Sequence, residues 1–379
     1  MTAKLLAALS PLALLAASCS APAAGDSVAT SREVGPAFAR TPIATFAEPW
    51  AMALLPGGEQ ALVTEKAGKL WLVSLEDGRK VPVAGVPGVD YGGQGGLGDV
   101  ALAPDFAATG LIYLTWAEAG QGDQRGAALG WATLVAGPTA QLAGLEVLWR
   151  QSPKVSGRGH YSHRIAFSPD GKYLFLASGE RQKFAPAQDL STNLGKILRL
   201  NRDGSPAAGN PFAGRSDPGA EVWSYGHRNV LGLKFDAQGR LWDLEHGPQG
   251  GDELNLVKPG QNYGWPLVSD GDHYGGKPIP RNRTRPDLAQ SAISWNPVIA
   301  PGDFVFYSGK MWPEWRDQAL IAGLGCECLV RVRIDGEQAI EEARYPMGKR
   351  IREIVVAPDG ALLVLEDGED GRLLRLTRK

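Results

Sequence analysis

Six copies of a strand-turn-strand pattern run through this chain from Ala51 to Leu376. Each copy is an apolar segment, a turn containing Pro, Asp or Gly, and a second apolar segment, often followed by a third. Short apolar runs bounded by such turns are typical of β-strands. The copies begin 49 to 73 residues apart and cover residues 51–73, 100–116, 165–177, 231–244, 304–334 and 354–376.

Six similar units predict a six-bladed β-propeller, because each unit is one sheet that can bury its faces only against its neighbours. A β-sandwich does not require six similar units. The 49 glycines and 11 tryptophans, without a long stretch of helical periodicity, also favour one all-β body. Polar loops between blades are expected to meet at one end of the central channel. A formal net charge of −2 argues against a nucleic-acid partner.

The N-terminal segment has the pattern of a targeting signal. Lys4 is the only charged side chain in residues 1–18, and the apolar run that follows it is too short to span a bilayer. Residues 16–19 resemble a lipobox, in which Cys19 would carry the lipid; cleavage near Ala24 is the alternative. We therefore expect a signal peptide at 1–18, a flexible tether at 19–41, a catalytic domain at 42–379, and a periplasmic, lipid-anchored protein.

Two further cysteines, Cys326 and Cys328, lie one residue apart. They could form a disulfide, act as a reactive dithiol, or be two separate buried thiols. Export favours oxidation, but the sequence leaves all three interpretations open.

Two loops stand out before predicted strands. The glycine-rich loop 90–97 lacks the lysine of a phosphate-binding loop and opens no helix, which argues against a nucleotide site. It is either a plain turn or a close approach to a flat ligand, with Gln94 as the hydrogen-bonding side chain. The loop 156–164 holds His160 and His163, two of only five histidines. A histidine at a channel mouth can act as a general base, although a structural role is the alternative.

Other polar residues also lie at predicted strand ends. Arg228 and Asn229 precede one strand, where arginine could supply positive charge to an anionic or carbonyl-bearing ligand. Arg350 and Arg352 alternate onto one face of another strand and could bind carboxylates, unless they form a solvated edge. The loop 247–248 could direct backbone carbonyl oxygens at a hard cation.

Five of these segments together resemble the soluble PQQ-dependent glucose and aldose sugar dehydrogenases, which are six-bladed propellers that use pyrroloquinoline quinone and calcium. The resemblance extends over residues 42–378, and its motifs occupy residues 93–106, 158–171, 221–233, 247–266 and 349–360. It is closer to the aldose branch, because Gly159 stands where the glucose enzymes carry an aspartate.

The resemblance implies a role for each matching residue. His160 would remove the proton of the anomeric hydroxyl while hydride passes to the quinone. Gln94, Arg228 and Asn229 would hydrogen-bond the quinone oxygens and stabilise the charge that develops there. The implied cofactor-binding set is Gln94, His160, Arg228, Asn229, Arg350 and Arg352, with the last two bound to the cofactor carboxylates.

The resemblance also implies metal ligands. Carbonyl oxygens of Gly247 and Pro248 would hold the calcium that acts as a Lewis acid on the quinone. A second, structural calcium is expected at Glu253 and Tyr263. A departure from the family pattern lies in residues 323–328, where Gly325 replaces a lysine that contacts the cofactor, so one cation is missing.

The expected function is the oxidation of aldoses at C1 to lactones, with electrons passed to an external quinone or cytochrome. Two other functions remain open. One is a calcium-dependent propeller hydrolase such as a lactonase, which needs several side-chain carboxylates at the metal. The other is a propeller that has lost catalysis and serves as a binding module.

Overall fold

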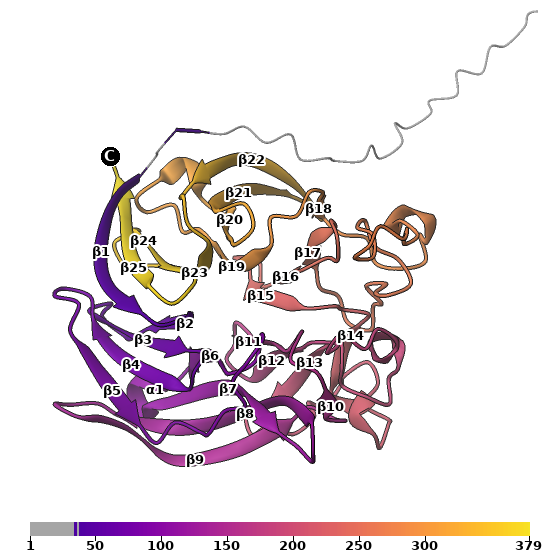
Figure 1. Ribbon diagram of the computed structural model, residues 1–379, viewed down its shortest axis with the longest axis horizontal. Coiled ribbons are helices and arrows are strands. Elements are labelled where there is room, and N and C mark those ends of the chain that lie inside the picture. Colours follow the sequence, from indigo (N-terminus) through magenta and orange to yellow (C-terminus); the bar gives the residue numbers. More distant parts are fainter. Residues whose placement is uncertain (1–33, 36–37) are drawn as a thin grey trace, which may run out of the picture.

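A computed structural model describes residues 34–35 and 38–379. The predicted signal peptide, Cys19 and most of the predicted tether lie outside the described residues. Within the described part of the chain, the strands form six four-stranded antiparallel units arranged around a common centre (Figure 1). The predicted all-β, six-bladed propeller is therefore confirmed. Among the described residues, no helix has both the length and the apolar character needed to cross a membrane.

The six units follow one another along the chain, and each begins with its innermost strand. The first two units are β2 (Pro49–Leu54), β3 (Gln60–Glu65), β4 (Lys69–Ser74) and β5 (Lys80–Ala84), then β6 (Leu97–Leu102), β7 (Leu111–Ala119), β8 (Gln124–Val135) and β9 (Ala140–Arg150). The third and fourth are β11 (Ser162–Phe167), β12 (Tyr173–Ser178), β13 (Lys196–Asn201) and β14 (Val222–Tyr225), then β15 (Val230–Phe235), β16 (Leu241–Glu245), β17 (Asp252–Leu256) and β18 (Ile293–Trp295). The fifth is β19 (Pro301–Phe306), β20 (Ala319–Gly323), β21 (Cys328–Asp335) and β22 (Gln338–Pro346), and the sixth is β23 (Ile351–Val356), β24 (Leu362–Glu366), β25 (Gly371–Arg378) and β1 (Phe38–Phe46).

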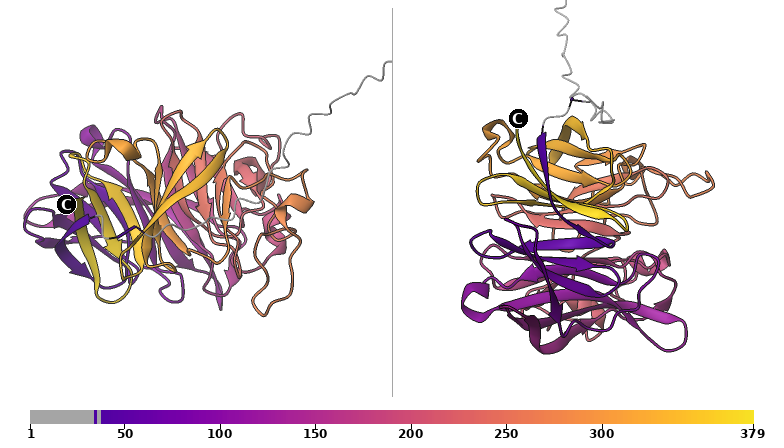
Figure 2. Two further views of the ribbon diagram at one scale, coloured as in Figure 1. Left: turned by 90° about the horizontal axis from the view of Figure 1, so that it is seen from above. Right: turned by 60° about the vertical axis from the view of Figure 1, so that its left-hand side comes forward.

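Short elements lie in the connections between these strands. They are α1 (Phe106–Thr109), β10 (Val155–Ser156), η1 (Ala185–Gln188), η2 (Pro218–Glu221), η3 (Asn282–Thr284) and η4 (Pro313–Trp315). Strand β10 pairs with β8, and a short parallel pairing of β5 with β9 joins the first two units into one sheet. Seen from the side, the loops between strands gather at the two faces of a flattened body (Figure 2).

The hydrophobic core is divided among the junctions between neighbouring units. Six clusters of buried side chains each draw on two adjacent units, including the junction of the sixth unit with the first. This distribution explains why the strand-turn-strand pattern was visible in the sequence. The inner strands of a unit need apolar side chains on both faces, because both faces of the sheet pack against its neighbours there.

The ring is closed by a strand from the N-terminal end of the described chain. Strand β1 pairs antiparallel with β25, so the sixth unit combines both ends of the domain (Figure 1). Strand β1 begins at Phe38, four residues before the predicted domain start at 42. The predicted tether, which extends to residue 41, therefore overlaps the first residues of β1. The Phe38 ring packs edge-on against Trp312, Trp315 and Tyr345 at centroid distances of 5.7, 6.0 and 5.4 Å.

The innermost strands share an irregularity near their starts. In all six units the register between the first and second strands shifts there, which leaves one or two residues unpaired. Bulges of this kind bend a strand and redirect its side chains, and they are frequent next to active sites. The residues left between the paired positions are Trp50, Ala51, Gly98, Asp99, His163, Arg164, Leu231, Gly302 and Arg352.

Arg164 lies at the point where these bulges converge. Its guanidinium contacts Glu353 at 2.7 Å and Asp99 at 3.4 Å, and donates to the carbonyl oxygens of Leu231 at 2.5 Å and Gly302 at 2.9 Å. The remaining innermost strand contributes Trp50, whose ring centroid lies 4.3 Å from the guanidinium carbon. The buried Arg164 side chain therefore contacts the innermost strands of all five remaining units.

Removal of the closing aromatic contact tests the role of β1. Phe38→Ala should lower the free energy of unfolding by about 3 to 5 kcal/mol, because it deletes a buried ring and leaves a cavity. Ile340→Ala, a truncation of an exposed side chain on β22, should change it by about 0.5 kcal/mol or less. Denaturant unfolding of both variants makes the comparison, and equal stability of the two would show that the Phe38 ring does not stabilise the closed ring of sheets.

Candidate active site and metal centre

A cavity of about 180 Å³ opens at the end of the channel where the bulges lie. Three cationic side chains, Lys66, Arg350 and Arg352, line it together with the predicted Gln94 and Asn229. The other lining residues are mainly apolar or aromatic: Trp50, Gly93, Tyr161, Ser162, His163, Leu231, His246 and Leu324. Carboxylates are absent from this lining within the described chain. The cavity therefore combines positive charge with flat apolar surface.

His160 lies beside this cavity in a constrained conformation. Its backbone N–H donates to Gln94 Oε1 at 2.7 Å, and its ring Nδ1 is hydrogen-bonded to a carboxylate oxygen of Glu180. A carboxylate accepts, so Nδ1 carries the proton and Nε2 keeps its lone pair. Burial lowers the pKa of His160 below 6.5, and the Arg228 charge adds to this, while Glu180 opposes it. A neutral imidazole with a lone pair on Nε2 can accept a proton.

His163 is a poorer candidate base than His160. It is fully buried, it stacks on Tyr161 with ring centroids 5.4 Å apart, and neither ring nitrogen has a hydrogen-bond partner. Burial lowers its pKa to about 3. With no group to orient the ring or to stabilise its protonated form, His163 is a packing residue that forms part of the cavity wall.

Glu180 was not identified from the sequence, because it lies twenty residues beyond His160 in a loop without a recognisable pattern. Its second oxygen accepts hydrogen bonds from the backbone N–H groups of Lys183 at 2.6 Å and Phe184 at 2.7 Å. The carboxylate is thus fixed by its own loop. Glu180 therefore supplies a carboxylate to His160 although position 159 is a glycine, where a Cβ would lie too close to the end of the Gln182 side chain.

Arg228 and Asn229 lie on the other side of His160. Arg228 donates through Nη1 to the His246 carbonyl oxygen at 3.0 Å, and its Nε is buried without a partner. Asn229 Oδ1 accepts a bond from Ser162 N–H at 3.2 Å. The structure thus brings Gln94, His160, Arg228 and Asn229 together, as the sequence predicted. An unpartnered buried guanidinium N–H is a group that a ligand oxygen could satisfy.

Arg350 and Arg352 both line the cavity; the Arg352 side chain is largely buried, whereas the Arg350 side chain is 49% exposed and also faces solvent. Both bind the same carboxylate, with Arg350 Nε 2.8 Å and Arg352 Nη2 2.9 Å from Asp367 oxygens. Asp367 was missed from the sequence because it follows β24, fifteen residues beyond Arg352. Its single negative charge leaves this arginine pair with one net positive charge.

A second, smaller cavity of about 20 Å³ adjoins Arg228 and His246. Gly247, Glu253 and Tyr263 line it, so three of the four predicted metal ligands meet around one space suited to a single ion. Pro248 is not among the residues that line it. The Tyr263 hydroxyl is used elsewhere, since it donates to the Leu256 carbonyl at 2.6 Å, so a metal bond from this residue would require its backbone oxygen.

Carboxylates crowd around this smaller cavity. Burial and the charges of Glu245 and Asp270 raise the pKa of Glu253 to about 8. His227, Asp243 and Glu245 form an adjacent buried group whose ligand atoms lie within 4.8 Å of one another. The sequence contained these residues in one segment, but their convergence depends on the pairing of β16 with β17. A divalent cation would relieve the repulsion among them.

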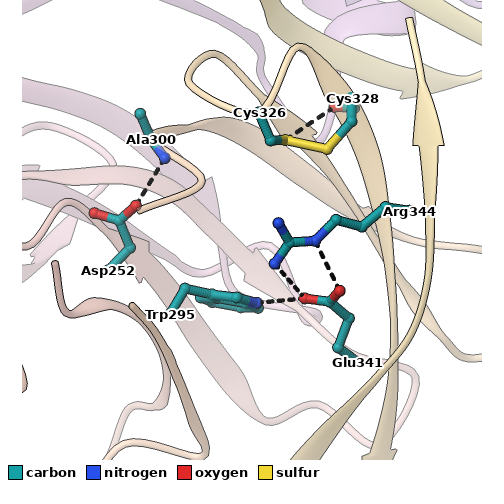
Figure 3. The surroundings of a disulfide bond; sticks show 7 residues. All are labelled: Asp252, Trp295, Ala300, Cys326, Cys328, Glu341 and Arg344. Carbon is teal, nitrogen blue, oxygen red and sulfur yellow. Dashed lines mark hydrogen bonds and ion pairs between the residues drawn. A yellow bond between two sulfur atoms is a disulfide. The ribbon is translucent and has the colours of Figure 1, made fainter. Parts of the chain in front are cut away.

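The loop at residues 323–328 is held by a disulfide. Cys326 and Cys328 are bonded, with Cα atoms 5.2 Å apart, which resolves the three interpretations left by the sequence (Figure 3). Gly325 N–H donates to the Ile299 carbonyl at 2.8 Å, and the neighbouring Ala300 N–H donates to Asp252 at 2.7 Å. The other Asp252 oxygen accepts from Gly247 N–H at 2.8 Å. Asp252 therefore connects the disulfide loop to the candidate metal loop.

Comparisons with known proteins agree on one family. The family model described as glucose/sorbosone dehydrogenase matches residues 46–375. The chain is 37% identical to the aldose sugar dehydrogenase YliI of Escherichia coli strain K12 over 335 residues, which is 87% of this chain and 90% of the relative.

Solved structures give the same result. The soluble aldose sugar dehydrogenase of Escherichia coli in its apo form superposes with a TM-score of 0.86 at 35% identity, covering 90% of this chain and all of that one. The PQQ-bound aldose sugar dehydrogenase of Streptomyces coelicolor gives 0.72 at 30% identity, covering 91% and 99% of the two chains.

The paired arrangement of His160 and Glu180 makes a prediction about titration. His160 should titrate below pH 6.5, and Glu180→Gln should lower its pKa further, because the carboxylate is the group that favours the protonated ring. Imidazole proton signals followed by NMR against pH measure both values, with His160→Gln to assign the resonance. An unchanged or higher pKa in Glu180→Gln would contradict the assigned contact.

Proposed function

Because the chain belongs to the glucose/sorbosone dehydrogenase family, we propose that it oxidises aldose sugars at the C1 hydroxyl to lactones, using PQQ and calcium, and passes the electrons to an external acceptor. The observation that carries the proposal is the position of His160, whose ring is oriented by Glu180 and whose backbone N–H is bonded to Gln94, a lining residue of the cavity that holds three cations. This arrangement places a proton acceptor next to a binding site for a polyanionic ligand.

The residues of the larger cavity fit PQQ, which is a flat aromatic compound with three carboxylates. Lys66, Arg350 and Arg352 match the carboxylates in charge, and the Trp50 and Leu324 side chains offer apolar surface to a ring system. The buried Arg228 Nε lacks a partner in the protein, so a ligand carbonyl could accept its hydrogen bond. Bound PQQ supplies the two-electron acceptor, and bound calcium supplies a Lewis acid that polarises it.

His160 is the residue that takes the proton. Its Nδ1–H is held by Glu180, which selects the tautomer with a free lone pair on Nε2, and burial keeps the ring neutral at neutral pH. When Nε2 accepts the C1 hydroxyl proton, the new positive charge lies next to the Glu180 carboxylate, which stabilises it. The loop 180–184 is therefore part of the catalytic machinery through its contact with the base.

Arg228 provides the positive field in which negative charge can develop. Its side chain is nearly buried, so its charge is poorly screened by water. The Trp265 ring lies beneath it, with the guanidinium carbon 5.1 Å from the ring centroid, and Phe184 stacks on Trp265. Phe184 is 44% exposed and forms an aromatic edge to the site, a surface suited to the apolar face of a sugar ring.

For calcium, the small cavity with Gly247, Glu253 and Tyr263 offers the oxygen ligands that this ion prefers. Glu245 and Glu253 line this small cavity, so side-chain carboxylates at the metal do not separate a dehydrogenase from a calcium-dependent hydrolase. The three cations of the larger cavity favour the dehydrogenase, because they suit a polyanionic cofactor. We also propose that the protein is exported and anchored by a lipid on Cys19, on the basis of the leader pattern in residues 1–19.

Replacement of the proposed base gives the first functional prediction. His160→Ala should slow sugar-dependent reduction of the cofactor by about 10²- to 10⁴-fold, the usual contribution of general base catalysis, with cofactor binding nearly intact. Stopped-flow absorbance measures this half-reaction. His273→Ala, which removes a partly exposed histidine, should leave the rate close to that of the parent. A His160 variant that reacts at the parent rate, with His163→Ala inactive, would reverse the assignment.

Reconstitution tests the proposed cofactors. Apo-protein given PQQ and calcium should develop a quinone absorbance that an added aldose bleaches, and the same mixture with a calcium chelator should not be bleached. Calcium should also raise the thermal unfolding temperature, because a ligand that binds only the folded state stabilises it. Magnesium at the same concentration is the control. If chelation altered neither property, the acidic cavity would not be a calcium site.

A further inference from the structure

The loss of a cation at Gly325 is not repaired by the loop that contains it. Gly325 N–H is bonded to Ile299, and a Cβ at this position would lie 3.0 Å from the Ala300 Cβ and 3.1 Å from the Ile299 oxygen. The disulfide between residues 326 and 328 restricts the loop further. A larger side chain at position 325 therefore requires a shift of the loop or of residues 299–300.

Lys66 enters the same cavity from another direction. It belongs to the turn between β3 and β4 in the first unit, whereas Gly325 lies after β20 in the fifth and Arg352 lies on β23 in the sixth. Its backbone is fixed on both sides, since Lys66 N–H donates to the Glu48 carbonyl at 3.1 Å and its carbonyl accepts from Leu97 N–H at 2.9 Å. The Lys66 side chain is only 15% exposed.

The positive charges around Lys66 outnumber the negative ones, so a ligand anion could bind there. Lys66 Nζ lies 2.9 Å from Glu48 Oε1, while Arg350 and Arg352 share Asp367, so three cations face two carboxylates at this end of the cavity. The backbone N–H of Glu48 donates to the carbonyl oxygen of Gly368, the residue after Asp367, at 2.9 Å, which places the two ion pairs next to each other. The group carries one net positive charge beside apolar walls.

We propose that Lys66 binds a carboxylate of the cofactor and replaces the cation that the 323–328 loop lacks; this inference rests on the proposed PQQ site. Glu48 holds the ammonium at the cavity wall while the site is empty. When a ligand carboxylate binds, Lys66 serves both anions, as an ammonium with three N–H donors can. Its role is in binding and not in the transfer of protons or electrons.

Calorimetric titration of apo-protein with PQQ tests the proposal directly. Lys66→Met should weaken binding at least tenfold, since one member of a charge-assisted pair is removed from a largely buried site. Lys69→Met, three residues along and 62% exposed, is the matched control and should change the dissociation constant less than twofold. Equal binding by the Lys66 and Lys69 variants would overturn the proposal, while a parent that binds no PQQ would overturn the proposed function instead.

Two further measurements separate a ligand contact from a structural ion pair. The trimethyl ester of PQQ has no carboxylate charge, so the loss caused by Lys66→Met should largely disappear with it; equal losses for acid and ester would indicate that the variant merely disturbs the site. Glu48→Gln removes the competing protein carboxylate, so PQQ should bind at least as tightly as to the parent. A Glu48→Gln variant weakened as much as Lys66→Met would show that the pair acts only as a structural bridge.

Discussion

The arrangement of the six units depends on Arg164, which contacts the innermost strand of each of the other five units. Buried ions are costly unless they are paired and hydrogen-bonded, and this guanidinium is surrounded by three carboxylates, two backbone carbonyls and one aromatic face. Hydrophobic junctions alone would allow neighbouring sheets to slide. A directional set of bonds at the axis fixes how far each strand enters the channel. Because Trp50 and Leu231 also line the cavity, the same set of bonds supports its floor.

The repeat pattern was sufficient to predict the fold. Because each sheet packs on both faces against its neighbours, every unit requires similar apolar segments. Closure was less visible. The pairing of β1 with β25 joins residues more than three hundred positions apart, and no local pattern in Phe38–Phe46 distinguishes a closing strand from a tether. The bulges that aim His163, Arg164 and Arg352 inward were also hidden, since a register shift depends on the partner strand and not on the bulged residues alone.

In the site, the sequence identified residues that lie in glycine-rich motifs but not the carboxylates that hold them. Glu180 and Asp367 lie in loops without a recognisable motif. Their roles can be recognised only from the folded contacts of Glu180 with His160 and of Asp367 with Arg352. Position 159, where the glucose enzymes carry an aspartate, is a glycine in this chain, so the motif itself offers no carboxylate to His160. The structure shows instead that a carboxylate reaches the same ring from a different loop, so a missing residue in a motif need not be a missing function.

The cations that line the cavity also come from different units, so ligand binding is linked to the closure of the ring. Lys66 belongs to the first unit and Arg350 to the sixth, and strand β1, which closes the sixth unit by pairing with β25, leads directly into the first unit. Without a ligand, the excess positive charge is shared across the junction and its members repel one another. An anion bound between them converts repulsion into attraction on both sides. A carboxylated ligand in this cavity therefore stabilises the closed ring as well as occupying the site, and its affinity and the stability of the propeller are two measures of one linkage.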